Sequence, residues 1–135
     1  EYVQLGLSIL FALAFSLCFK YLNFKSTAEW PYDASHKEFL ADLAENHSIV
    51  NKPILEIGIN WLFEPALNFY RESEEIDYLA PLTRNGYQDK SYDGYYLWGE
   101  KDQEMISKLS QSGSNYELVA QYENGATFFL KKDYL

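Results

Sequence analysis

Two hydrophobic patterns divide the chain into a short apolar stretch and a longer segment with helical and strand-like periodicity. From Tyr2 to Phe19 the sequence carries no charge and consists mainly of Leu, Ile, Phe, Ala and Val. At about 1.5 Å per residue, a helix of this length covers roughly 27 Å, close to the thickness of the hydrocarbon core of a bilayer. We therefore expect residues 1–24 to form a transmembrane helix, with the Lys20 side chain reaching the interface.

Three other interpretations of the apolar stretch are open. A cleaved signal peptide begins with positive charge and ends at a small-x-small site, whereas this sequence begins with Glu1. A lipoprotein would use Cys18, but Leu17 occupies the position where a small residue is expected. The stretch could also be a buried helix of the globular part. Because no initiator Met precedes it, we expect it to be the last span of a longer protein.

The first half of the remaining sequence predicts two helices around one strand. A helix is expected over 35–46, where Ser35 and Glu38 have the spacing of a capping box and the apolar residues share one face. The run over 54–59 alternates as a strand does, with its odd positions on the better-buried face. A second helix is expected over 65–72, since a proline stands at its first turn.

The second half predicts one more helix and several strands. Asp102 is suited to begin the helix and Gly113 to end it. Asn124-Gly125 lies between two strand-like runs and is the strongest hairpin signal in the chain. The other expected segments are a short strand over 76–79, a polar loop over 83–92, an aromatic strand over 95–98, and hairpin strands over 116–122 and 126–131.

This order of elements predicts a small layered α/β domain over residues 25–135. Helices that alternate with strands favour a mainly parallel sheet with right-handed crossovers, closed here by a C-terminal antiparallel hairpin. A ferredoxin-like α+β arrangement is the alternative, because two βαβ-like units separated by a loop also match it.

Composition and charge exclude several classes of function. Asp and Glu number 20 and Lys and Arg 11, and the resulting net charge of −9 argues against nucleic acid as a partner. The single cysteine, Cys18, lies in the apolar stretch, so the domain has no disulfide. His36 and His47 lack a second pair of ligands that would complete a metal site. We therefore expect neither a metal nor a cofactor in this chain.

The best site candidate lies where the strand over 54–59 leads into the following helix, the edge at which open α/β sheets bind ligands. There Trp61 and Phe63 could stack on a sugar or a lipid, while Asn60 and Glu64 could hydrogen-bond hydroxyl groups. The alternative is that both aromatic residues pack beneath the helix and that Glu64 interacts favourably with its N-terminal dipole.

A second cluster surrounds the aromatic strand. Glu100 and Asp102 could lie near Glu64 if the two strands are neighbours, and paired carboxylates can divide acid and base roles. Helix capping by Asp102 is the alternative, and Arg71 and Arg84 could meet a phosphate or carboxylate. No catalytic motif accompanies these residues. The full set of candidate ligand-binding residues is Asn60, Trp61, Phe63, Glu64, Asp93, Tyr96, Trp98 and Glu100.

Several segments carry a resemblance to a known family. They are Trp30-Pro31-Tyr32-Asp33-Ala34, the run Asn60-Trp61-Leu62-Phe63-Glu64-Pro65-Ala66-Leu67-Asn68-Phe69-Tyr70-Arg71, and Tyr92-Asp93-Gly94-Tyr95-Tyr96-Leu97. With the apolar stretch, they resemble the C-terminal extracytoplasmic tail of bacterial multi-spanning glycosyltransferase-like proteins related to the dolichyl-phosphate-mannose protein mannosyltransferases. The resemblance implies that catalytic acids lie in loops between earlier membrane helices, so none is assigned here.

The resemblance also implies location and function. It places the domain in the periplasm or outside the cell, although Lys20 and Lys25 alone would favour the opposite orientation. The implied function is that of a non-catalytic accessory domain in a membrane glycosyltransferase that uses a lipid-linked sugar, binding acceptor or bracing the membrane core. Its expected partners are the membrane, the other transmembrane helices of the parent protein, and a glycan or lipid-linked sugar.

Two other function classes are open. The first is a glycan- or protein-binding module, tethered by a single helix and without transferase activity. The second is a stand-alone hydrolase that uses Glu64 with Glu100 or Asp102, which requires carboxylates close enough to flank one bond.

Overall fold

The secondary structure follows the order expected from the sequence, with one strand fewer. The computed structural model describes residues 2–21, 33–50, 52–87 and 91–134. Its elements are α1 (Tyr2–Tyr21), α2 (His36–His47), β1 (Ile57–Ile59), the 3-10 helix η2 (Trp61–Phe63), α3 (Glu64–Ser73), β2 (Gly94–Trp98), α4 (Gln103–Leu109), β3 (Tyr116–Gln121), β4 (Ala126–Lys131) and the 3-10 helix η3 (Lys132–Tyr134).

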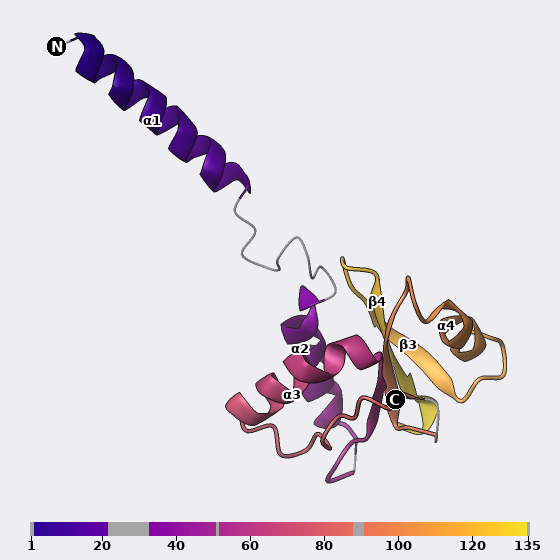
Figure 1. Ribbon diagram of the computed structural model, residues 1–135. Helices are drawn as coiled ribbons and strands as arrows, with labels where there is room; N and C mark the ends of the chain where they lie inside the picture. Colours follow the sequence, from indigo (N-terminus) through magenta and orange to yellow (C-terminus); the bar gives the residue numbers. More distant parts are fainter. Residues whose placement is uncertain (1, 22–32, 51, 88–90, 135) are drawn as a thin grey trace.

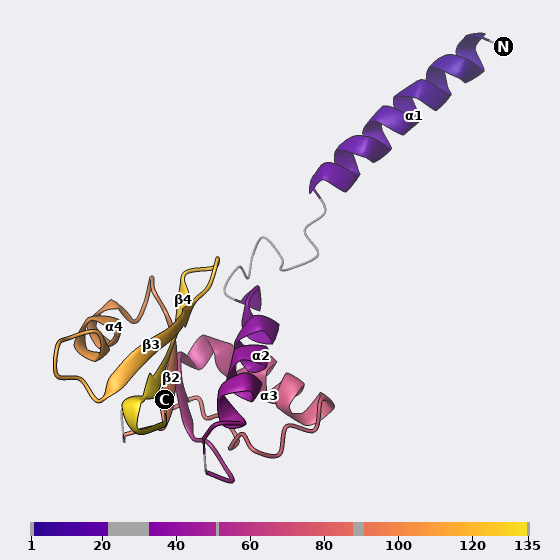
Figure 2. The same cartoon turned by 180° about the vertical axis from the view of Figure 1, so that it is seen from behind.

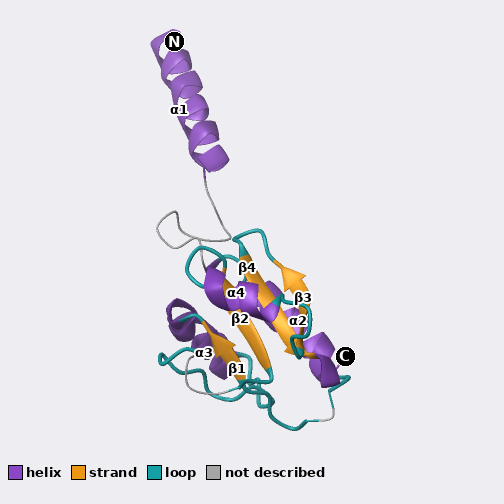
Figure 3. Ribbon diagram, turned by 90° about the vertical axis from the view of Figure 1, so that its right-hand side faces the viewer, coloured by secondary structure: helices purple, strands orange, loops and turns teal. Residues whose placement is uncertain are grey.

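The four strands form one mixed sheet in the order β1-β2-β4-β3 (Figure 3). β1 and β2 are parallel, whereas β4 is antiparallel to both β2 and β3. The α/β domain and its C-terminal hairpin are thus confirmed, but the expectation of a mainly parallel sheet is wrong. The ferredoxin-like alternative does not fit either, because β1 and β2 are parallel neighbours.

The difference arises in two places. The segment 76–79, expected to be a strand, makes only a single parallel bridge between Leu79 and Leu55 and adds no further strand to the sheet. The hairpin then inserts its second strand, β4, beside β2, where Tyr95 pairs with Phe129. β2 is therefore paired with a parallel strand, β1, on one side and with an antiparallel strand, β4, on the other.

Helices cover both faces of the sheet (Figures 1 and 2). α2 and α3 lie on one face and α4 on the other. Side chains alternate across β2, so Tyr96 and Trp98 pack with α2 and α3, while Tyr95 and Leu97 pack with α4. Every residue of β2 is buried as a result. The three layers explain why β2 carries large apolar or aromatic side chains at every position after Gly94.

Aromatic rings fill the larger of the two cores. Phe39 of α2 stacks on Tyr96 with ring centroids 4.0 Å apart and meets Phe128 edge-on at 5.1 Å. Phe63 contacts the same tyrosine at 4.8 Å. Such offset and edge-to-face pairs contribute stability beyond their buried area. Much of the aromatic content of the chain is therefore core.

The predicted transmembrane helix is wrong. α1 is a helix, but no helix in the part of the chain that the structure describes is long and apolar enough to cross a membrane. The expectation rested on the length and lack of charge of the stretch, in which Gln4, Gly6, Ser8 and Ser16 interrupt the apolar residues. The alternative of a buried helix is wrong as well, because residues 6–17 are exposed. The boundary expected at residue 24 lies outside the described residues.

His36 is a titratable group enclosed in the aromatic core. Its ring is almost fully buried, with Nδ1 3.3 Å from the Tyr96 hydroxyl and Nε2 3.0 Å from an Asp33 carboxylate oxygen. The Asp33 carboxylate would favour a protonated ring, but burial dominates and lowers the pKa of His36 from 6.5 to about 4. The ring is therefore neutral at pH 7.

This burial makes stability depend on pH. Because the pKa of His36 is lower in the folded chain than in the unfolded chain, its contribution is complete above pH 6.5 and is lost as the pH falls towards about 4. We expect the free energy of unfolding to fall by on the order of 2–3 kcal/mol over this interval, measured by urea unfolding at several pH values.

Two variants separate His36 from the acidic residues that also titrate at low pH. His36→Gln should flatten the dependence between pH 6.5 and 5, while His47→Gln should retain the wild-type slope. A His36→Gln variant with an unchanged slope would show that another group controls acid stability.

Candidate functional site

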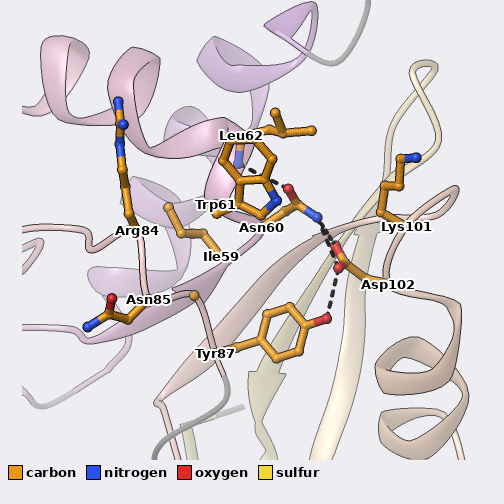
Figure 4. A pocket seen from close by; sticks show the side chains of 10 residues that line it. Ile59, Asn60, Trp61, Leu62, Arg84, Asn85, Tyr87, Lys101 and Asp102 are labelled. Carbon is orange, nitrogen blue, oxygen red and sulfur yellow. Dashed lines mark hydrogen bonds between the residues drawn. The ribbon is translucent and has the colours of Figure 1, made fainter.

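A cleft opens at the carboxyl ends of the two parallel strands. It has a volume of about 480 Å³, within the usual range of small-molecule sites, and is lined by three segments: 59–62 after β1, 84–87 in the following loop, and 101–102 after β2 (Figure 4). This is the edge of the sheet that the sequence pointed to.

The buried carboxylate of Asp102 joins these three segments. Its Oδ1 accepts hydrogen bonds from Asn60 Nδ2 at 3.0 Å and from the Tyr87 hydroxyl at 2.8 Å. Its Oδ2 accepts from Asn60 Nδ2 at 2.9 Å and from the Trp98 backbone N–H at 2.8 Å. One side chain therefore ties the ends of β1 and β2 to the loop. We call Asp102, Asn60, Tyr87 and Trp98 the Asp102 clamp.

Local backbone hydrogen bonds position Asp102 and Asn60 for the clamp. The Trp98 carbonyl accepts from the Lys101 and Asp102 backbone N–H groups at 3.0 and 2.9 Å, so the chain turns back directly after β2. Asn60 is extended and caps η2, because its Oδ1 accepts from the Leu62 N–H at 3.0 Å. The amide of Asn60 is thus fixed with its NH₂ group directed at Asp102.

The loop that carries Tyr87 is held against β1 by a glycine turn. Gly86 adopts a φ of +66°, a conformation that glycine reaches without steric cost. A Cβ atom at this position would lie 3.4 Å from the Ile59 carbonyl, which shows how closely the loop approaches the strand. The Tyr92 hydroxyl also donates to the Gly86 carbonyl at 2.8 Å. The wall of the cleft is therefore preformed.

The clamp fits a structural role better than an acid-base role. A carboxylate offers about four lone-pair sites, and three donor groups make four contacts with the oxygens of Asp102. Burial and the hydrogen bond to Asp102 raise the pKa of Tyr87 to about 12, so its hydroxyl remains a donor at neutral pH. Asp102 stands at the N-cap position of α4, as the sequence predicted, but its side chain makes no cap bond and bonds the clamp instead.

Two of the predicted site residues lie in the cleft wall. Asn60 belongs to the clamp, and the Trp61 side chain lies at the mouth of the cleft with 58% of its surface exposed. Glu64 lies beside the cleft, where it accepts from Arg84 Nε at 3.0 Å and from Asn68 Nδ2 at 2.8 Å. The Arg84 hydrogen bond lowers the pKa of Glu64. Their ligand-binding role stays a prediction.

Other predicted residues lie in the core or elsewhere on the surface. Phe63 and Tyr96 are fully buried, and Trp98 is buried with its Nε1 donating to the Asn124 carbonyl at 3.3 Å. Glu100 is exposed but does not line the cleft. These aromatic residues cannot reach a ligand in this fold because the helices cover them.

Asp93 lies at the opposite end of β2 from the cleft. Its carboxylate accepts from Lys52 Nζ at 2.5 Å, from the Glu56 N–H at 2.9 Å and from the Tyr134 hydroxyl at 2.8 Å. Burial alone would raise the pKa of Asp93, but these bonds lower it. Asp93 therefore anchors the C-terminal η3 to the sheet and does not share a site with Asn60.

Lys101 and Tyr87 were missed as cleft residues. Lys101 follows the second parallel strand, so the same sheet-edge argument that selected Asn60 could have found it. Tyr87 lies in a polar loop without periodicity and carried no signal. Within the described residues, no cluster of three or more His, Cys, Asp or Glu side chains could hold a metal ion.

Removing the charge of Asp102 should destabilise the domain. In Asp102→Asn, one carboxylate oxygen becomes an NH₂ group that faces existing donors, so we expect the free energy of unfolding to fall by about 2–4 kcal/mol. Tyr87→Phe removes a single bond to the charged group and should cost about 1–2 kcal/mol.

Glu104→Gln is the matched control, because Glu104 is an exposed acid on the neighbouring α4. It should change stability by less than about 0.5 kcal/mol in the same urea titration. Equal stabilities for Asp102→Asn and Glu104→Gln would contradict the clamp.

Comparisons with known proteins add no relative. No protein-family model matches the chain, and neither the curated proteins nor the solved structures give a significant match. The resemblance to the mannosyltransferase-related tails therefore stays a prediction.

Proposed function

We propose that the domain is a non-catalytic binding module that holds a carbohydrate ligand in the cleft at the ends of β1 and β2. The observation that carries this proposal is the exposed indole of Trp61 at the mouth of a preformed polar cleft. An aromatic face beside a few fixed polar groups is an arrangement that suits a sugar, whose ring has an apolar face and hydroxyls at its edge.

The contrast between neighbouring aromatic residues supports a ligand role for Trp61. Phe63, two residues further on, is fully buried beneath α3, whereas more than half of Trp61 faces solvent. The core therefore does not require the indole. Large exposed aromatic side chains beside a concave surface are typical of recognition sites.

Preorganisation also supports binding at this position. The Asp102 clamp fixes Asn60 and Tyr87 before any ligand arrives, so little conformational entropy is lost on binding. The Asn85 side chain borders the same cleft and could donate to or accept from a hydroxyl group. A role as the acceptor-binding domain of a glycosyltransferase would be compatible with such a cleft, but it rests on the resemblance alone.

A glycan panel with the full chain tests the proposal. We expect at least one sugar to bind and to change the tryptophan fluorescence, since Trp61 is solvent-exposed and Trp98 is buried. Trp61→Ala should weaken that binding at least about tenfold, because losing an indole stacking surface costs on the order of 1–2 kcal/mol.

Phe69→Ala is the matched control. Phe69 is 65% exposed on α3 and does not line the cleft, so its removal should leave sugar affinity unchanged. The absence of binding to any sugar, or equal affinities for wild type and Trp61→Ala, would overturn the proposal. Capture of a protein instead of a glycan would favour the protein-binding alternative.

A further inference from the structure

The exposed charged side chains that line the cleft have the opposite sign to the net charge of the chain. The net charge is −9, yet the two exposed charged side chains that line the cleft, Arg84 and Lys101, are both cationic. Among the described residues that line it, Asp102 is the only acid; it is 4% exposed, and three donor groups make four contacts with its oxygens. The exposed charges that line the cleft are therefore both positive, with Glu64 beside the cleft as the ion-pair partner of Arg84.

Arg84 is oriented by a series of hydrogen bonds from α3 and the loop that precedes it. Asn68 exchanges two bonds with the Leu82 backbone, donating to its carbonyl at 2.9 Å and accepting from its N–H at 3.0 Å. The same Asn68 amide donates to Glu64 Oε1 at 2.8 Å, and Glu64 Oε2 accepts from Arg84 Nε at 3.0 Å. The guanidinium is thus held at the cleft by Glu64.

This support leaves the outer edge of the guanidinium available. Only Nε is used by Glu64, and the two terminal nitrogens have no hydrogen-bond partner among the residues that the structure describes. The Arg84 side chain is 71% exposed. Two parallel N–H groups at the end of a planar guanidinium match the oxygens of a carboxylate or phosphate.

Lys101 stands on the opposite wall of the cleft (Figure 4). Figure 4 shows Arg84 and Lys101 on either side of Asn60 and Trp61. The backbone of Lys101 is fixed by its bond to the Trp98 carbonyl, while its exposed ammonium has no ion-pair partner within the described part of the chain. Glu100 precedes it but does not line the cleft.

We propose that the ligand is an acidic sugar whose phosphate or carboxylate group is bound by Arg84, with Lys101 adding attraction from the opposite wall. The inference rests on the proposed function, because the sugar ring would stack on Trp61. Arg84 would select ligands that carry a negative charge, and Trp61 would bind the sugar ring. A neutral sugar would make no charge-assisted bond with the terminal nitrogens of Arg84 or with Lys101 and should bind more weakly.

Calorimetric titration of the full chain with matched ligands tests this inference. Glucose, glucose 6-phosphate and glucuronate share a ring and differ in charge, so they separate a phosphate from a carboxylate as the preferred group. We expect at least one acidic sugar to bind about tenfold or more tightly than glucose, with a preference that weakens at high salt. Inorganic phosphate alone should bind more weakly than the preferred acidic sugar.

Substitutions at the two cations provide the second readout. Arg84→Gln should abolish the preference for the acidic sugar, and Arg84→Lys should restore part of it, because the charge returns without the paired N–H groups. Lys101→Ala should weaken acidic ligands several-fold and leave glucose unchanged. Lys108→Ala, which removes an exposed lysine of α4 away from the cleft, should have no effect.

The outcomes separate the inference from the proposed function. If glucose binds as tightly as both acidic sugars and Arg84→Gln changes nothing, the inference is overturned while the sugar site stands. If inorganic phosphate binds as tightly as the acidic sugars, the inference that the site selects acidic sugars is also overturned. If no sugar binds, the proposed function fails and the inference fails with it.

Discussion

The fold of the cleft depends on one buried carboxylate. Asp102 accepts hydrogen bonds from Asn60 after β1, from Tyr87 in the following loop and from the Trp98 backbone at the end of β2. A charged acceptor buried in this way is stable only while its donors surround it. The same bonds that satisfy Asp102 therefore fix the ends of β1 and β2 and the loop between them. The candidate binding site is a consequence of that constraint.

Local periodicity accounts for most of the elements that the sequence predicted correctly. The apolar stripe of α2, the proline at the start of α3 and the Asn124-Gly125 turn act over a few residues, and each element formed close to its expected range. Strand order depends on contacts between distant segments. Nothing local to β4 indicates that it pairs with β2, so the mixed sheet could not be derived from patterns alone.

The residues of the candidate site that lie at the edge of the sheet could be predicted, but the residue contributed by the loop could not. Asn60 and Trp61 were found because parallel strands end at a common edge. The sequence could not show which aromatic residues are buried. Phe63 and Trp61 are both large aromatic residues of η2, but Phe63 is fully buried whereas Trp61 is 58% exposed. The length of the apolar stretch likewise led to the wrong prediction for α1: its residues 6–17 are exposed, and no helix among the described residues qualifies as a membrane span.

The most direct test of the clamp is an NMR measurement on the full chain at neutral pH. A scalar coupling across the hydrogen bond between the Trp98 amide nitrogen and the Asp102 carboxylate carbon should be detectable, and the Trp98 amide proton should exchange with solvent as slowly as the other amides of β2. Absence of the coupling, together with exchange as fast as that of exposed turns, would contradict the claim that Asp102 holds the cleft together.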